Sequence, residues 1–224
     1  MGPESTNQII RRGKGTEMQA SDYQTGVLQT ASCDKKKITN RFMGFVEPPP
    51  NENIINLLHS ILGVTSEVGE LLGAETDENV IEELGDLLWY TTLGIDALGE
   101  KLAVPSINYM FDKYLNNNFV VDRMSKLFCL SAELSSIFKA FLFYGREIKK
   151  QDVLSKLKDV SELIFAIGYT FSHSPRALME KNQKKLLDKE KGRYKSGSFS
   201  EDSANVRDVN SEYEAMRLVE GKDD

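Results

Sequence analysis

The sequence predicts an all-α protein, and three observations support this fold class. Apolar residues recur every three or four positions from residue 54 onward, as Ile54, Leu58 and Ile61 illustrate. No segment shows the alternation of apolar and polar residues that a half-buried strand requires. The 224-residue chain is 40% hydrophobic and 28% charged, which suits one globular core with polar ends.

The first two predicted helices lie between clear breaks in this pattern. The run EPPPNEN, residues 47–53, stops any preceding helix, and its asparagines can cap the next one. We expect the first helix at about 53–73, where the apolar positions form one face. The polar link GAETDEN then leads to a second helix at about 78–99, which ends in GEKLAVPS.

Four further helices are predicted beyond this point. Pro105 suits the start of the next element, and the polar run YGREIKKQ separates the two longest helices. His173-Ser174-Pro175 interrupts the pattern before a final charged helix. The four are expected at about 107–117, 119–146, 151–172 and 175–191.

One domain accounts for most of the chain. We expect residues 1–20 to be disordered, because they are polar and lack a periodic pattern. Residues 21–195 are expected to form the all-α domain, and residues 196–224 a polar tail with a short helix near its end.

The charge and the cysteines narrow the classes of function. A net charge of −6 and a pI near 5.2 argue against a general binder of nucleic acid or membrane surfaces, because such proteins present a basic face. Cys33 and Cys129 lack a metal-binding spacing and are expected to be free thiols in a reducing compartment. The N-terminus does not resemble a secretory signal, and no uninterrupted apolar run is long enough to cross a bilayer. We therefore expect a cytoplasmic location.

A weak internal repeat relates the two pairs of long helices. TSEVGELLGA (65–74) aligns with SAELSSIFKA (131–140), and EELGDLLW (82–89) aligns with KDVSELIF (158–165). The second copy keeps the apolar skeleton and loses part of the acidic set. Two amphipathic helix pairs also resemble each other by chance, so a degenerate second repeat and a coincidence are both open.

Acidic residues occur among the apolar positions of the first two helices. Glu67 and Glu70 are three residues apart on the first helix. Glu83 and Asp86 are three apart on the second, so each pair shares one helix face. Four carboxylates close together repel one another unless a cation holds them, and oxygen ligands in this number suit Mg²⁺ or Mn²⁺. We expect a divalent metal site, the alternative being two solvated helix faces.

The spacing of these acids resembles the motif of the MazG-like all-α NTP pyrophosphohydrolases. The shared features are Glu-x-x-Glu, a spacer of twelve residues, and Glu-x-x-Asp before an apolar-aromatic run. NIINLLHSILGVTSEVGELL and VIEELGDLLWYTTLGIDALG resemble the first two core helices of that superfamily. KNQKKLLDKEKGRY resembles its later segment, and FSEDSANVRDVNSEYEAM resembles phage-type members. Between residues 105 and 175 the resemblance is only to the general helical pattern or to the duplicated dimeric dUTPases.

The resemblance implies a hydrolase that cleaves a nucleoside triphosphate between its α and β phosphates. Carried over to this chain, the four acids named above, Glu67, Glu70, Glu83 and Asp86, would be the Mg²⁺ ligands. Bound metal would orient the triphosphate and lower the pKa of a water. Glu70 is the candidate catalytic carboxylate that orients or deprotonates this water. Glu82 is either a supporting neighbour of the ligands or a solvated helix residue.

The resemblance also implies contacts to the phosphates. These residues are Asn182, Lys185, Arg193 and Tyr194. The alternative is an ordinary charged helix, and the spacing from Lys-Leu to Arg-Tyr is wider here than in the superfamily. The base-binding residues are unknown. His59 and Trp89 are candidates, although both types are more often core residues at helical spacing.

Three functions remain open at this point. The first is a pyrophosphohydrolase acting on a (deoxy)nucleoside triphosphate, with a slight preference for a purine such as dGTP. The second is a dimeric-type dUTPase or dCTPase. The third is a non-catalytic helical module that binds a nucleotide or a partner. Wide apolar helix faces predict a homodimer or tetramer.

Overall fold

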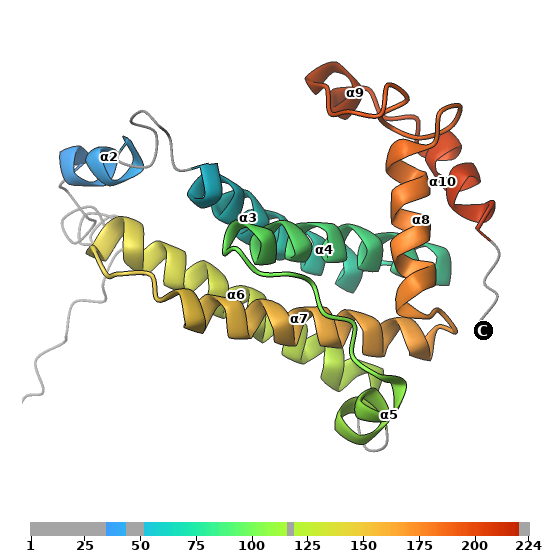
Figure 1. Ribbon diagram of the computed structural model, residues 1–224, viewed down its shortest axis with the longest axis horizontal. Helices are drawn as coiled ribbons and strands as arrows, with labels where there is room; N and C mark the ends of the chain where they lie inside the picture. The colour runs from blue at the N-terminus through green and yellow to red at the C-terminus, as the bar shows by residue number, and fades with distance from the viewer. Residues whose placement is uncertain (1–34, 44–51, 116–118, 220–224) are drawn as a thin grey trace, which may run out of the picture. The chain divides into compact units, whose positions relative to one another are not determined.

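The computed structural model describes residues 35–43, 52–115 and 119–219, which are all-α as predicted and contain no strand (Figure 1). The chain divides into two compact units, Met1–Lys37 and Ile38–Asp224, and only residues 35–37 of the first are described. The predicted disorder of residues 1–20, and Cys33, lie outside the described residues. The helices are α2 (Lys35–Met43), α3 (Glu52–Gly73), α4 (Asp77–Ala97), α5 (Ile107–Met110), the π-helical turn η1 (Phe111–Leu115), α6 (Val120–Tyr144), α7 (Lys150–Thr170), α8 (Pro175–Leu187), α9 (Glu201–Asn205) and α10 (Val209–Arg217).

Four long helices form the core of the second unit. α3 packs against α4 and α6, and α7 packs against the same two helices, so each member of the bundle has two neighbours (Figure 1). The inward residues follow the spacing seen in the sequence, and they are almost fully buried. On α3 they include Ile61, Val64, Val68 and Leu71. α8 packs against the side of α4, and α10 packs on α8.

Local sequence explains where the helices that carry the acids begin and end. The Thr76 hydroxyl accepts a hydrogen bond from the Asn79 N–H at 3.2 Å and caps α4. Ser174 caps α8 in the same way, and Pro175 occupies its first turn. Only residues 74–76 connect α3 to α4. The end of α3 and the start of α4 therefore lie side by side, which places their acids opposite each other.

The predicted helix bounds agree with the structure to within a few residues, with three differences. The short helix expected at 107–117 is divided into α5 and η1. α2 and α9 are not among the helices predicted above. The expected polar tail is tied to the bundle, because α10 buries Ala215 and Met216.

α6 is distinguished by its length and its apolar composition. Among the described residues it is the one helix whose length and apolar character would suffice to cross a membrane, and 28% of its most apolar window is buried. Core helices of water-soluble proteins meet the same criterion, and α6 buries Leu127 and Leu134 in the bundle. Its other side exposes Val121 and Phe128. The cytoplasmic location stays a prediction.

Candidate metal centre

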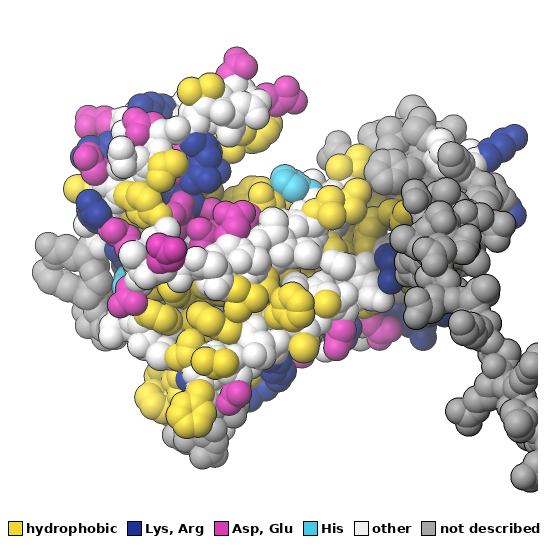
Figure 2. Space-filling view, turned by 180° about the vertical axis from the view of Figure 1, so that it is seen from behind, with side chains coloured by type: hydrophobic (Ala, Val, Ile, Leu, Met, Phe, Trp, Pro, Cys, Tyr) yellow, Lys and Arg dark blue, Asp and Glu magenta, His cyan; other side chains and the backbone are white. Residues whose placement is uncertain are grey.

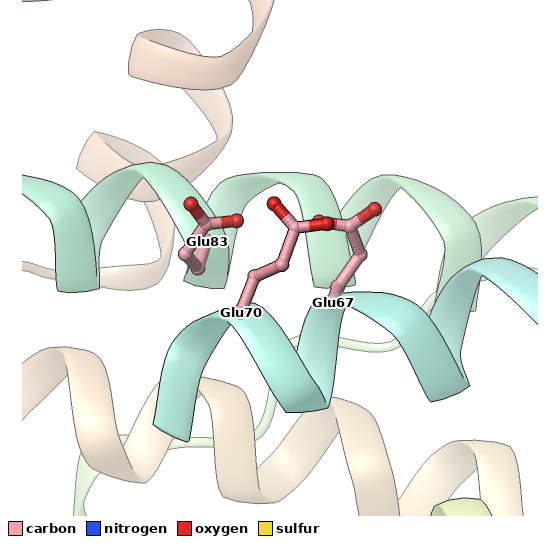
Figure 3. A group of neighbouring side chains, drawn as sticks. All are labelled: Glu67, Glu70 and Glu83. Carbon is pink, nitrogen blue, oxygen red and sulfur yellow. The ribbon is translucent and has the colours of Figure 1, made fainter. Parts of the chain in front are cut away.

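Three glutamates from two helices gather near the short link between α3 and α4. Glu67 and Glu70 come from α3 and Glu83 from α4, and each offers one carboxylate oxygen so that the three oxygens lie within 4.8 Å of one another. Figure 3 shows the carboxylates directed to the same side of the two helices. We call these three residues the acidic cluster. Oxygens at this spacing can close on a divalent cation, since Mg²⁺ binds oxygen at about 2.1 Å.

The three acids of the cluster differ in their exposure to solvent. Glu67 is 8% exposed, Glu83 is partly buried, and Glu70 is exposed. Burial is the main cause that raises the pKa of Glu67 to about 7, and the charges of Asp86 and Glu70 add to it. Burial likewise raises the pKa of Glu83 to about 8, followed by repulsion from Glu82 and Asp86. The cluster is thus short of positive charge.

The acids next to the cluster are compensated, and the cluster is not. Asp86 accepts hydrogen bonds from the Asn182 Nδ2 at 2.9 Å and from the Lys185 Nζ at 2.5 Å. Glu82, 6% exposed, accepts from the Lys185 Nζ at 2.7 Å and from the Arg207 Nη2 at 3.2 Å. In the part of the chain that the structure describes, no lysine or arginine forms an ion pair with the acidic cluster.

The structure therefore brings three of the four predicted metal ligands together and holds the fourth aside. Asp86 lies one turn after Glu83 on α4, but both of its carboxylate oxygens face α8. Its role as a ligand stays a prediction. Figure 2 shows acidic side chains next to lysine and arginine side chains near the C-terminal helices.

The predicted phosphate-binding residues lie on α8, which packs against α4, and in the segment just after α8. Asn182 and Lys185 are buried against Asp86, as described above. Arg193 forms a double hydrogen bond with Glu212, from Nε to Oε1 at 3.0 Å and from Nη2 to Oε2 at 2.8 Å. The Tyr194 ring packs on Phe199, with 5.6 Å between centroids. Contact of these residues with phosphate stays a prediction.

Three charged residues of the site were not assigned from the sequence. Glu82 was left between a supporting and a solvated role, and the structure buries it in ion pairs. Glu212 is 2% exposed and accepts from both Arg193 and Arg207. Glu212 lies three positions before the buried Ala215, so the helical spacing of the two residues could have indicated that Glu212 is buried. The sequence holds no such indication for Arg207, since no periodic apolar pattern surrounds it.

The candidate base-binding residues form an aromatic group beside the acidic cluster. Trp89 makes edge-to-face contacts with His59 and Tyr90, with ring centroids 5.9 and 5.0 Å away. Trp89 is 41% exposed, and His59 is exposed, so neither is a core residue. The Tyr90 ring lies directly against Gly63, where a Cβ would come within 2.1 Å of it. Gly63 is one helical turn before Glu67, which places the aromatic group next to the acidic cluster.

In the second pair of helices, α6 and α7, the acids at the aligned positions form ion pairs with lysines. Glu133, which aligns with Glu67, is paired with Lys156. Glu162 and Asp159 both pair with Lys113, at 2.6 and 3.6 Å. The described residues contain no second group of three acids that could hold a cation. Whether the halves arose by duplication stays open, but the acids of the second half are neutralised by lysine.

Comparisons with models of protein families, with curated proteins and with solved structures find no significant match for this chain. The likeness to MazG-like pyrophosphohydrolases therefore rests on the residues and spacings quoted above. The family, the reaction and the identity of the metal are expectations at this point.

Proposed function

We propose that this protein is a metal-dependent nucleoside triphosphate pyrophosphohydrolase, which releases a monophosphate and pyrophosphate. The observation that carries the proposal is the uncompensated acidic cluster. Its three carboxylates lie within 4.8 Å of one another and lack a basic partner among the described residues, whereas the acids beside them have one. A divalent cation, Mg²⁺ or Mn²⁺, supplies the missing charge and prefers oxygen ligands.

The residues of the site suit separate tasks in this reaction. Glu67 and Glu83 are the more enclosed acids, and with Glu70 they would hold the metal. When bound, the metal neutralises the triphosphate and lowers the pKa of a water. Glu70 is the exposed member, so we assign to it the orientation of the attacking water. Asn182 and Lys185 fix Asp86 at the edge of the cluster.

The same arrangement supports a nucleoside triphosphate as the substrate. Phosphates would lie between the acidic cluster and the cationic side chains near α8, and the base would extend toward Trp89 and His59. Either a purine or a pyrimidine can contact an exposed indole, so the slight preference for a purine such as dGTP rests on the resemblance alone.

One assay tests the proposal. The protein is incubated with each common NTP and dNTP, with and without Mg²⁺, and the products are resolved. We expect monophosphate and pyrophosphate, with turnover lost in Glu83→Gln. Glu78→Gln is the matched control, because Glu78 lies on the same helix, is exposed and pairs with Arg217. Preference for dUTP or dCTP would favour the dimeric dUTPase branch. Diphosphate and orthophosphate, or no turnover at all, would refute the proposal, and the latter would favour a non-catalytic binding module.

We also propose that the protein assembles as a homodimer or tetramer. The exposed side of α6 carries Val121 and Phe128, which are 70% and 56% exposed and two helical turns apart. Sedimentation of the wild type and of Val121→Asp tests this: the wild type should be at least dimeric, and the variant should dissociate.

A further inference from the structure

Three cationic side chains form ion pairs with the acids beside the acidic cluster. They differ in how many of their N–H donors lack a partner among the described residues. Lys185 is almost fully buried, and its ammonium already bonds Glu82 at 2.7 Å and Asp86 at 2.5 Å. A group enclosed in this way cannot reach a phosphate without breaking its ion pairs with these two carboxylates in a largely buried place. Lys185 is thus suited to positioning Asp86 and poorly suited to binding substrate.

Arg193 is an intermediate case. Two of its three nitrogens are occupied by Glu212, in the double hydrogen bond described above. Its side chain is 15% exposed. Nη1 is the nitrogen without a hydrogen bond to another described residue, so Arg193 retains a limited capacity for a further acceptor.

Arg207 is the most available of the three. It bonds Glu82 at 3.2 Å and Glu212 at 3.0 Å, and both bonds use the same nitrogen, Nη2. Its Nε and Nη1 make no hydrogen bond to any other residue that the structure describes, and the side chain is 37% exposed. Each guanidinium edge with two parallel N–H groups includes Nη2, which is occupied here, so Nε and Nη1 can each donate a separate hydrogen bond to a phosphate oxygen.

Arg207 is connected to the surroundings of the acidic cluster through Glu82. Glu82, which Arg207 contacts, is the residue immediately before Glu83 of the acidic cluster. The buried Glu212 holds Arg207 and Arg193 together, so two guanidiniums face the same carboxylate at the edge of the site. Like charges are kept side by side here by one acid, and an anion with several oxygens can bridge them.

We propose that Arg207 is a further substrate-binding residue, whose guanidinium contacts the phosphate chain of the nucleotide. This inference rests on the proposed function. It adds to the predicted phosphate-binding set a residue from the segment between α9 and α10, and it gives Lys185 the task of holding Asp86.

The experiment compares Arg207→Ala with Arg217→Ala, a matched control. Arg217 also connects the α10 region to α4, through hydrogen bonds to Glu78 at 2.7 and 2.8 Å, but both partners are exposed. Either variant loosens the attachment of α10, and only Arg207→Ala removes the proposed phosphate contact. KM is measured with the nucleoside triphosphate that the wild type hydrolyses fastest. Binding of inorganic tripolyphosphate is measured by calorimetry in the presence of Mn²⁺.

We expect Arg207→Ala to raise KM and to weaken tripolyphosphate binding by about 10- to 100-fold, the range for a hydrogen bond to a charged group. Mn²⁺ binding without phosphate should be unchanged, and Arg207→Lys should restore part of the affinity. Equal KM values for Arg207→Ala and Arg217→Ala, in an otherwise active protein, would overturn this inference alone. A wild type that hydrolyses no nucleotide would overturn the proposed function, and the inference with it.

Discussion

The Lys185 ammonium lies 2.5 Å from the Asp86 Oδ2, and this pair joins α8 to α4 across 99 positions of the chain. Lys185 is fully buried, and Asp86 also accepts a hydrogen bond from Asn182. Two helices that are distant in sequence, α4 and α8, thus meet at one carboxylate. The pair keeps Asp86 at the edge of the acidic cluster, where its charge contributes to the raised pKa values of Glu67 and Glu83.

Lys185→Met tests how much this pair contributes to the fold. The substitution leaves Glu82 and Asp86 without their shared cation in a buried place, so we expect the free energy of unfolding to fall by about 3–5 kcal/mol. Lys184→Met is the control, because Lys184 is exposed and pairs with Asp188 at the end of its own helix. Urea denaturation measures both. A loss equal to that of the control would show that Lys185 is dispensable.

Glu67→Gln is expected to weaken Mn²⁺ binding by at least about 100-fold, since even residues that only support metal ligands contribute 10- to 100-fold. Glu133→Gln is the control at the aligned position of the second half, where the acid pairs with Lys156. It should leave Mn²⁺ binding unchanged. Electron paramagnetic resonance of free Mn²⁺ gives both affinities, and equal losses in the two variants would exclude the acidic cluster as the site.

The stability of the metal-free protein should decrease as the pH rises from about 5 to 8. The pKa values of Glu67 and Glu83 rise from 4.5 to about 7 and about 8 in the folded protein, so the native state binds protons more tightly than the unfolded chain in this range. Their contribution to stability is present below pH 4.5 and is lost as the pH passes the folded values. Thermal unfolding in EDTA should show the decrease, and Glu83→Gln should reduce it.

Added Mg²⁺ should oppose this loss. Because a cation binds the ionised carboxylates, we expect its effect on Tm to be larger at pH 8 than at pH 5.5. A metal effect that is equal at both pH values would contradict the assignment of these two glutamates as ligands.

Gly63→Ala should destabilise the protein by about 1–3 kcal/mol, the usual range for an overpacked contact. The new Cβ would meet the Tyr90 ring at 2.1 Å, so the ring must move away from residue 63. Gly69→Ala lies on the same helix with no atom within 4 Å, and it should instead stabilise by about 0.5–1 kcal/mol. Thermal denaturation measures both, and changes of the same sign would contradict the described packing.

Trp89→Ala should raise KM for the nucleotide by about 5- to 150-fold, the range that corresponds to loss of one base–aromatic contact. Binding of inorganic tripolyphosphate should not change, because it lacks a base. Trp89 is the only tryptophan of the chain, so quenching of its fluorescence by nucleotide gives an independent measure in the wild type. Parallel losses for both ligands would show that Trp89 acts through the fold instead.

Local spacing accounts for what the sequence could predict. Glu67, Glu70 and Glu83 depend on helix period and on one short link, and both can be recognised along the chain. The partners of Asp86 depend on α8, which lies about a hundred residues further on, and no local pattern fixes that contact. Glu212 was missed because its helix is short and its neighbours in sequence are polar, although it lies on the same buried helix face as Ala215.

The three glutamates of the acidic cluster lie within seventeen consecutive residues, from 67 to 83, on a single helical hairpin. Such a hairpin needs few long-range contacts and forms early, whereas Lys185 and Arg207 reach the site only when distant parts of the chain arrive. Under the proposed function, the chain growing on the ribosome therefore completes the ligands of the proposed cation before the residues that would receive the nucleotide have been made. Occupancy by the ion would then precede, and not follow, completion of the protein.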